Sequence, residues 1–318
     1  MLIKVKNIYL VLVLLIFITT GCSKEETNVI ENDIVDEVIT DALGNKAVLK
    51  DKPERVVSLV GSYAEIWTLA GGNLVGVTDD VEKENRMEIT DDIKVVGTIK
   101  EPNVEEVLAL NPDFVLLTTD VESHLKIAET LEKANISYAF FKVEEFEDYL
   151  DMLKVCTDIT ERKDLYEENG LKVEKEIEDI LSKVDSEIEE KPTVLFVRAF
   201  SSGAKAKKDD NMTCTMLDNL ATINIAAKHE SLLEDLSIEE IIEEDPDFIF
   251  VTTMGDEQKA IDGLKNGIET NPAWSNLSAV KNDRYILLPK QLFHYKPNNR
   301  WGESYGYLAE IIYPEIFE

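Results

Sequence analysis

Residues 103–119 read NVEEVLALNPDFVLLTT and residues 237–253 read SIEEIIEEDPDFIFVTT, so one pattern occurs twice, at an offset of 134 residues and without a gap. Each copy starts with a polar residue that can cap a helix and continues through a short helix with two acids in its first turn. A Pro-Asp turn and an apolar strand ending in two threonines follow. A strand that is hydrophobic on both faces is typical of a parallel sheet covered by helices. The repeat therefore predicts two similar α/β lobes.

The sequence around the repeat supplies further elements of such lobes. Residues 55–60 form an apolar strand that leads through Gly61 into a helix predicted at 63–70, and residues 74–78 form the next strand. In the second half, residues 193–199 play the same role, and a helix is predicted to begin at Met216. These patterns are those of βαβ units.

A stretch between the halves, residues 148–189, is almost free of Gly and Pro and has helical periodicity with Glu-Lys pairs. It is interrupted at 158–160, where Thr160 can cap a new helix. We expect a long helix that joins the lobes. The alternative is two ordinary lobe helices and a flexible linker.

The beginning of the chain has a different character. Lys4 and Lys6 precede an apolar run of eleven residues, 8–18, which is too short to span a bilayer and fits a secretory signal. Gly21 stands directly before Cys22, and polar residues follow, which resembles the lipobox of a bacterial lipoprotein. Thr19 departs from that pattern, which usually has Leu there. We expect lipidation of Cys22, with a plain apolar anchor or a signal cut elsewhere as the alternative.

These observations divide the chain into five parts. They are a signal peptide (1–21), a tether (22–40), an N-terminal α/β lobe (41–158), a connecting helix (159–189) and a C-terminal α/β lobe (190–318). A single acyl chain binds a membrane only marginally, so stable anchoring needs the two or three chains of a diacylglycerol-modified cysteine. Such a modification of Cys22 would hold the protein at the extracytoplasmic face of the cell membrane.

The composition is strongly acidic. The chain has 318 residues, with 64 acidic and 33 basic side chains and a formal net charge of −31. Such a surface repels nucleic acid and anionic lipid, so neither is expected as a partner. Besides Cys22 there are Cys156 and Cys214, which we expect to be free or buried thiols, because their spacing matches no zinc motif.

Four stretches carry a resemblance to a known family: residues 53–65, 96–113, 274–284 and 292–301. In this order they resemble the ABC-transporter solute-binding proteins of the helical-backbone class, which bind iron-siderophores, haem and cobalamin. The resemblance covers residues 41–317 and implies two Rossmann-like α/β lobes, a long inter-lobe helix and a ligand cleft between the lobes.

The resemblance also implies a docking pair. In that family one glutamate from each lobe meets arginines of the permease subunits, and the matching residues are Glu105 and Glu239. The alternative is that these acids only complement the helix dipole. We prefer that alternative for the neighbouring Glu106 and Glu240.

Ligands of open α/β sheets bind beyond the carboxyl ends of the strands. That rule, together with the resemblance, nominates nine residues. They are Ser62, Tyr63, Thr119, Arg198, Met212, His229, Met254, Phe293 and Tyr295.

Each nomination has an alternative. The guanidinium of Arg198 suits an anionic chelate, but it could instead pair with a carboxylate of its own lobe. Tyr63, Phe293 and Tyr295 could stack on a ligand or belong to the edge of the core. His229 could be an axial ligand to haem iron, with Met212 or Met254 opposite, or simply a surface histidine.

The chain has only three histidines, which disfavours a bare transition-metal site. The motifs of a nucleophile elbow, a Walker loop, a dinucleotide fingerprint and a zinc protease are missing from the sequence, so we expect neither an enzyme nor a cofactor.

We therefore expect a monomeric solute-binding lipoprotein that captures a ferric chelate and delivers it to ABC permease subunits. A siderophore is the first choice of ligand, haem the second and cobalamin the third. A surface sensor or adhesin without a transport role is the alternative function.

Overall fold

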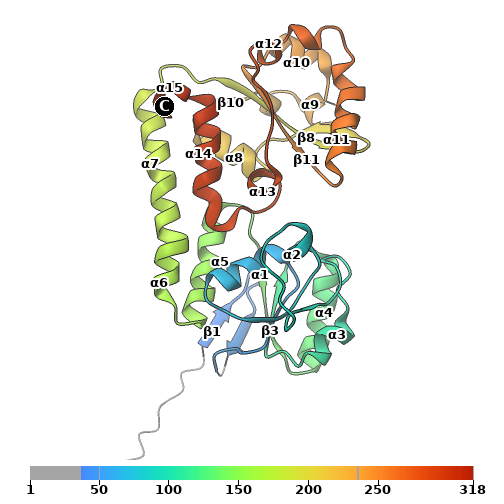
Figure 1. Ribbon diagram of the computed structural model, residues 1–318, viewed down its shortest axis with the longest axis vertical. Coiled ribbons are helices and arrows are strands. Elements are labelled where there is room, and N and C mark those ends of the chain that lie inside the picture. The colour runs from blue at the N-terminus through green and yellow to red at the C-terminus, as the bar shows by residue number, and fades with distance from the viewer. Residues whose placement is uncertain (1–36, 50, 235, 318) are drawn as a thin grey trace, which may run out of the picture. The chain divides into compact units, whose positions relative to one another are not determined.

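The computed structural model describes residues 37–49, 51–234 and 236–317. Within these residues the strands form two five-stranded sheets and one two-stranded hairpin (Figure 1). Cys22, the predicted signal peptide and most of the predicted tether lie outside the described residues. No helix within the described ranges has the length and apolar character that a membrane span requires.

The N-terminal lobe is built on a parallel sheet with the strand order β5-β4-β3-β6-β7. Its elements are β1 (Glu37–Thr40), β2 (Lys46–Leu49), β3 (Val56–Ser58), α1 (Gly61–Leu69), β4 (Leu74–Val77), α2 (Asp80–Lys83), β5 (Lys94–Val95), α3 (Val104–Ala109), β6 (Phe114–Thr118), α4 (Glu122–Lys133) and β7 (Ser137–Phe141). Strands β1 and β2 form a separate antiparallel hairpin. The chain adds β4 and β5 on one side of β3, and then β6 and β7 on the other.

The C-terminal lobe has the strand order β10-β8-β11-β12, with parallel pairs, and β9 forms an antiparallel hairpin with β8. Its elements are β8 (Thr193–Phe200), β9 (Gly203–Ala206), α8 (Met212–Asn219), β10 (Ile223–Asn224), η2 (Ile225–Ala227), α9 (Glu230–Glu234), α10 (Ile238–Glu244), β11 (Phe248–Thr253), α11 (Glu257–Leu264), η3 (Lys265–Glu269), η4 (Trp274–Asn276), α12 (Ser278–Lys281), β12 (Tyr285–Leu287) and α13 (Lys290–Phe293). The predicted pair of α/β lobes is thus confirmed.

Seven further segments are helical: α5 (Phe146–Ile159), α6 (Lys163–Tyr166), η1 (Glu167–Leu171), α7 (Lys172–Glu187), η5 (Asn298–Arg300), α14 (Trp301–Ile312) and α15 (Pro314–Phe317). The backbone stays helical from 163 to 187, because the residues at the junctions of α6, η1 and α7 are right-handed. The π-turn η1 inserts into this long helix, and α7 packs along α14 (Figure 1). Tyr149 donates its hydroxyl hydrogen to the carbonyl oxygen of Asn169 within η1, at 2.7 Å.

Two local predictions were wrong. Thr160 does not cap a new helix: it ends α5, its hydroxyl donates to the carbonyl of Ala70 at 2.5 Å, and Glu161 turns left-handed before the chain restarts at Lys163. The helix predicted from Met216 begins at Met212, because the Asn211 side chain accepts a hydrogen bond from the Thr213 amide and caps it there.

The repeated motif has the same structure in both lobes. Asn103 and Ser237 cap α3 and α10 with their side chains. After each helix the residue before the proline is left-handed, with φ of 45° at Asn111 and 40° at Asp245. Asn and Asp tolerate this conformation better than other residues with a side chain. The repeat therefore encodes a helix start and a helix stop at equivalent places.

The aspartate after each proline fixes the next strand. Asp113 accepts hydrogen bonds from the amides of Glu54 and Arg55, at 2.8 and 3.0 Å, directly before β3. Asp247 accepts from the amide of Thr193 at 2.8 Å, at the first residue of β8. The motif thus fixes β6 beside β3 in the N-terminal sheet and β11 beside β8 in the C-terminal sheet.

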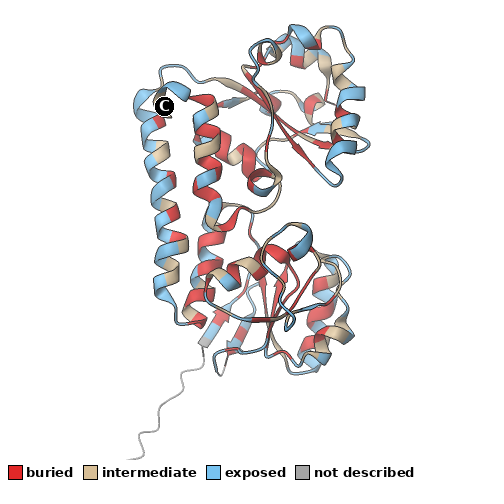
Figure 2. Ribbon diagram, viewed as in Figure 1, coloured by how far each residue is buried: buried red, intermediate tan, exposed pale blue. Residues whose placement is uncertain are grey.

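Both faces of the central strands of the two large sheets are buried, as expected for parallel strands under helices (Figure 2). Alternate residues of β6, such as Leu116 and Val115, belong to two different hydrophobic clusters, and so do Phe196 and Val197 of β8. The cluster that holds Leu116 also holds Phe196, so one core takes in a face of each sheet. It is continued by α5, α7, α8 and α14.

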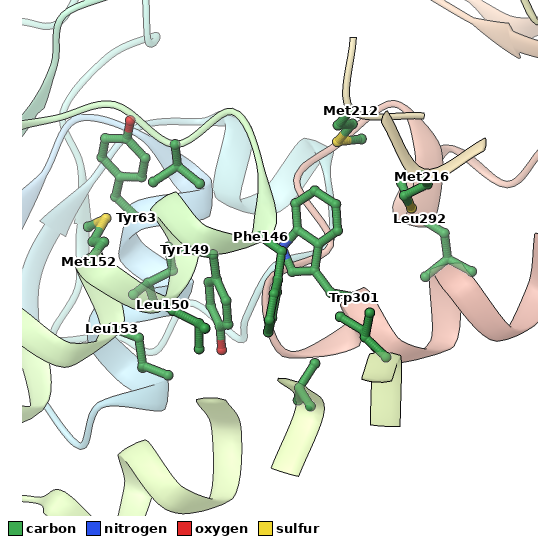
Figure 3. Close-up of a cluster of buried hydrophobic side chains, with 14 of the residues drawn as sticks. Tyr63, Phe146, Tyr149, Leu150, Met152, Leu153, Met212, Met216, Leu292 and Trp301 are labelled. Carbon is green, nitrogen blue, oxygen red and sulfur yellow. The ribbon is translucent and has the colours of Figure 1, made fainter. Parts of the chain in front are cut away.

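The centre of this shared core is aromatic. Figure 3 shows Phe146 of α5 and Trp301 of α14 side by side, with Tyr149 and Leu150 on one side and Met212 on the other. The ring centroids of Phe146 and Trp301 are 6.1 Å apart, in an edge-on arrangement. Because this core is continuous, the two lobes are joined by packed apolar side chains and not by a bare linker.

Candidate ligand-binding site

The strand orders point to one edge of each sheet. Strand addition reverses between β3 and β6 in the N-terminal lobe and between β8 and β11 in the C-terminal lobe. Ligands of open α/β sheets bind beyond the carboxyl ends of the strands at such switch points. The residues to consider are therefore those at the ends of these four strands.

Arg198 lies near the end of β8 and is half-buried. Its Nη2 stands 3.3 Å from Nδ1 of His294, and within the described residues no carboxylate lies at ion-pair distance from it. The alternative of a pairing with a carboxylate of its own lobe is thus not what the structure shows. Burial lowers the pKa of Arg198, which Asp210 partly opposes.

His294 is neutral in this arrangement. A guanidinium can only donate, so Nδ1 of His294 accepts and its proton sits on Nε2. Burial, and then the charges of Arg198 and Lys290, lower its pKa to about 4. A neutral imidazole beside Arg198 leaves the positive charge of the guanidinium uncompensated.

Lys296 adds a second cation. Burial lowers its pKa first, while Glu144, Asp120 and Asp148 raise it and Arg198 lowers it further. Its Nζ donates to the carbonyl oxygen of Glu144 at 3.4 Å, so this lysine reaches residues that follow β7 of the other lobe. Two poorly hydrated cations can bind a carboxylate or phenolate oxygen of an anionic ligand.

The three nominated residues of the N-terminal lobe differ in whether the core already holds their side chains. Ser62 lies buried in the first turn of α1, and Thr119 is half-buried, with its hydroxyl 3.4 Å from Asp120. The side chain of Tyr63 is 3% exposed and its hydroxyl donates to the carbonyl of Phe141 at 3.2 Å. This burial favours the core-edge alternative for Tyr63.

Three of the C-terminal nominees also differ in exposure. Phe293 is 1% exposed, which again favours the core, and Met212 is buried at 7%. Met254 is 44% exposed directly after β11. Of this group only Met254 offers a free surface at a strand end.

Tyr295 is half-buried, and the guanidinium of Arg86 lies 5.6 Å from its ring centroid. One face of the ring is therefore used by a residue of the N-terminal lobe. Tyr295 stays a predicted ligand contact.

His229 is held by its own lobe. Its Nε2 lies 2.8 Å from a carboxylate oxygen of Glu244, and its Nδ1 lies 3.8 Å from Glu240, both on α10. An axial ligand to haem iron would have to release one of these contacts. The surface alternative is favoured for His229.

The other titratable groups do not form a metal centre. In the described part of the chain no three His, Cys, Asp or Glu side chains gather as metal ligands would. Cys156 and Cys214 are free and buried, as expected, and burial raises the pKa of both thiols. They act as small apolar core residues.

Comparison with known proteins identifies the family. A family model described as periplasmic binding protein matches residues 56–292. The chain belongs to the periplasmic binding protein family. Members of this family are transport solute-binding proteins, so this chain is a binding protein and not an enzyme.

This periplasmic binding protein shares low sequence identity with three similar proteins. It is 26% identical over 289 residues to the Fe(3+)-citrate-binding protein YfmC of Bacillus subtilis, with 88% of this chain and 87% of that one covered. The iron uptake substrate-binding protein PiuA of Streptococcus pneumoniae aligns with a TM-score of 0.68 at 19% identity, covering 87% and 98%. S. aureus IsdE, solved with heme, gives 0.66 at 18%, covering 81% and 98%. The two structures show the fold alone.

The periplasmic binding protein presents its two predicted docking acids alike. Glu105 and Glu239 are exposed in the first turns of α3 and α10. Their neighbours are engaged within their own lobes, Glu106 at 3.6 Å from Lys94 and Glu240 with Ser231. Glu239 itself accepts from the hydroxyl of Ser237 at 3.4 Å, so the difference between the docking acid and its neighbour is clearest in the N-terminal lobe, and permease docking by Glu105 and Glu239 stays a prediction.

Sequence reasoning missed Arg86 of this periplasmic binding protein, and it reached Lys296 only as the last residue of the strand-end segment 293–296, without placing it among the nine nominated residues. Lys296 follows the nominated Tyr295, and a lysine in a predicted strand-end segment of a very acidic chain was a usable signal. Arg86 gave no such signal, because it lies after α2 in a stretch without a clear pattern. Only the fold brings it to Tyr295.

Proposed function

We propose that this protein captures an anionic ferric chelate, with a siderophore as first choice, and delivers it to the permease of an ABC importer. The observation that carries the proposal is the contact of Arg198 with His294 near the end of β8, with Lys296 close enough for the charge of Arg198 to lower its pKa, in a chain whose net charge is −31. An acidic protein that keeps Arg198 without an ion-pair partner, and a partly buried lysine near it, is suited to an anion. The similarity to a protein named for Fe(3+)-citrate binding supports the same class of ligand.

Haem is the second choice of ligand and cobalamin the third. The main argument for haem was His229, and its contact with Glu244 at 2.8 Å weakens that argument. Haem also carries carboxylates, so the cations would serve it too. The test below therefore separates haem from other ferric chelates.

The proposed delivery uses the lipid anchor and the two acids. Cys22 would carry the lipid and keep the binding protein near the permease. Glu105 and Glu239, exposed on one short helix of each lobe, would meet arginines of the transmembrane subunits. The continuous core shared by the lobes supports a small movement on ligand capture, because packed interfaces do not deform continuously.

Purified protein titrated with ferric citrate, with iron-free citrate and with haemin tests the ligand class. We expect tryptophan fluorescence to fall with the ferric chelate and not with iron-free citrate. A shift of the Soret band with haemin, and no response to ferric citrate or to a panel of ferric siderophores, would assign haem instead. No response to any of these ligands would overturn the proposal.

Variants connect the binding to the site. Arg198→Gln and Lys296→Met are each expected to weaken ferric chelate binding about tenfold, the effect of one charge-assisted hydrogen bond. Arg162→Gln is the matched control, because Arg162 is exposed and paired with Asp164. Equal affinities of Arg198→Gln and the control would remove the observation on which the proposal stands.

A further inference from the structure

The segment between α13 and α14 belongs to the C-terminal half but is held by the N-terminal lobe. Asn298 is fully buried, and its Nδ2 donates to the carbonyl of Ser62 at 3.0 Å and to Oε2 of Glu65 at 2.6 Å. Its backbone is left-handed, with φ of 52°. Both acceptors lie on α1, so the chain makes its turn against that helix.

Arg86 holds the same segment from a second direction. Its Nη1 donates to Oε2 of Glu65 at 3.0 Å and to the carbonyl of Lys296 at 2.5 Å. Its Nη2 lies 2.7 Å from Glu84, and its guanidinium lies over the ring of Tyr295. The side chain of Arg86 is 7% exposed, so nearly all its donors face these partners.

The carboxylate of Glu65 joins both sets of contacts. One oxygen, Oε2, accepts from Arg86 and from Asn298. Burial raises the pKa of Glu65, while Arg86 and Asn298 act in the opposite direction. Desolvated charges of this kind contribute little net stability compared with well-packed apolar residues, and their best attested use is to fix one arrangement. Here the arrangement that they fix is the path of residues 295–298.

We propose that Glu65, Arg86 and Asn298 are positioning residues, which set the place of Tyr295 and Lys296 from the N-terminal lobe so that both lobes determine ligand affinity. This inference rests on the proposed function, since Lys296 is one of the two cations that would bind the chelate. Arg86 acts through the segment and does not touch the ligand.

A double-mutant cycle on the full chain tests this. Binding of ferric citrate, or of the ferric siderophore that binds most tightly, is measured for the wild type, Arg86→Gln, Lys296→Met and the double variant. When two residues are coupled, the loss of affinity in the double variant differs from the sum of the losses in the single variants. We therefore expect Arg86→Gln to weaken binding about tenfold in the wild type and less than about threefold when Lys296 is already Met. Arg162→Gln, which removes an exposed charge paired with Asp164, is the matched control and is expected to change affinity less than about twofold.

Hydrogen exchange of the unliganded proteins gives a second readout that needs no ligand. In Arg86→Gln and Glu65→Gln we expect faster exchange in residues 294–300, with residues 172–187 unchanged. Arg86→Lys keeps the charge but loses the planar fork, so it should recover only part of the affinity.

The outcomes separate the inference from the proposed function. Equal losses on both backgrounds of the cycle, or no local change in exchange, would overturn the positioning role. Failure of the wild type to bind any ferric chelate would overturn the proposed function, and hydrogen exchange alone would then decide whether these residues hold the segment.

Discussion

At the scale of single residues, two histidines show how environment decides chemistry. His124 is fully buried; its Nδ1 accepts from the amide of Thr118 at 3.1 Å, and its Nε2 donates to the carbonyl of Ile99 at 2.9 Å. It is a structural residue with both nitrogens used by the backbone. His294 instead has Arg198 at Nδ1, so its neutral state serves the candidate site.

His294 should make the protein sensitive to acid. Its pKa of about 4 lies below the ordinary 6.5, so between these values the unfolded chain binds the proton more readily and stability is lost as the pH falls. We expect wild type to lose about 2 kcal/mol more than His294→Gln between pH 7 and pH 4.5, after allowance for solvent screening. Urea unfolding at the two pH values measures this, and parallel losses in both proteins would contradict it.

At the scale of elements, the repeated motif works through backbone groups. The left-handed residues stop α3 and α10, and the following aspartates accept amides at the starts of β3 and β8. An amide left without a partner carries a desolvation penalty. The two aspartates therefore specify which strand lies beside each repeated strand.

Asp247 is half-buried and accepts from both the amide and the hydroxyl of Thr193, so its removal should lower the stability of the protein. We expect Asp247→Ala to lower the free energy of unfolding by about 2 kcal/mol. Asp247→Asn, which keeps an acceptor, should cost less. The control is Asp262→Ala, where an exposed aspartate bonds only to Gln258. The urea midpoints of the variants, compared at an unchanged m-value, measure these differences in stability. Equal midpoints for Asp247→Ala and the control would count against a stabilising role of Asp247.

At the scale of the whole molecule, the core shared by the lobes leads us to expect that they unfold together. The cluster that includes Leu116 and Phe196 has no break between the lobes, and Asn169 adds polar ties. Its Nδ2 donates to the carbonyl of Leu69 at 3.0 Å, and its Oδ1 accepts from Asn299 at 3.3 Å. The π-turn therefore connects α1 with the segment that leads into α14.

The three tryptophans can report on this unfolding separately, because Trp67 lies in α1, Trp274 beyond α11 and Trp301 in α14. We expect variants that keep only Trp67 or only Trp274, with Phe elsewhere, each to show a single fluorescence transition that coincides with its own far-UV dichroism transition. Two steps in the dichroism of either variant, one per lobe, would show that the core does not couple the lobes.

Charge reversal at the two docking acids should separate capture from delivery. We expect Glu105→Lys combined with Glu239→Lys to leave ferric chelate affinity unchanged and to reduce uptake by cells to about the background level, since opposed charges at an interface suppress binding. Glu129→Lys with Asp262→Lys changes two other exposed acids and should keep uptake. Normal uptake by the first pair would point to the sensor alternative or to another docking surface.

The sequence predicted the two lobes because its pattern is local. The caps, the Pro-Asp turn and the four consecutive apolar residues each act within one element, so the repeat could be interpreted without the fold. Helix boundaries at Thr160 and Met216 were missed, because each depended on one hydrogen bond, from Thr160 to Ala70 or within the Asn211 cap. Arg198 was nominated by its place after an apolar strand.

The sequence by itself determined that the chain makes two α/β lobes with matched acids, since these follow from periodicity and capping. Only the tertiary structure decided that Tyr63 and Phe293 enter the core and that His229 pairs with α10. It also decided that Arg86 meets Lys296, residues 210 positions apart. The physical reason is that burial and charge pairing depend on which elements pack together, and no local pattern records that.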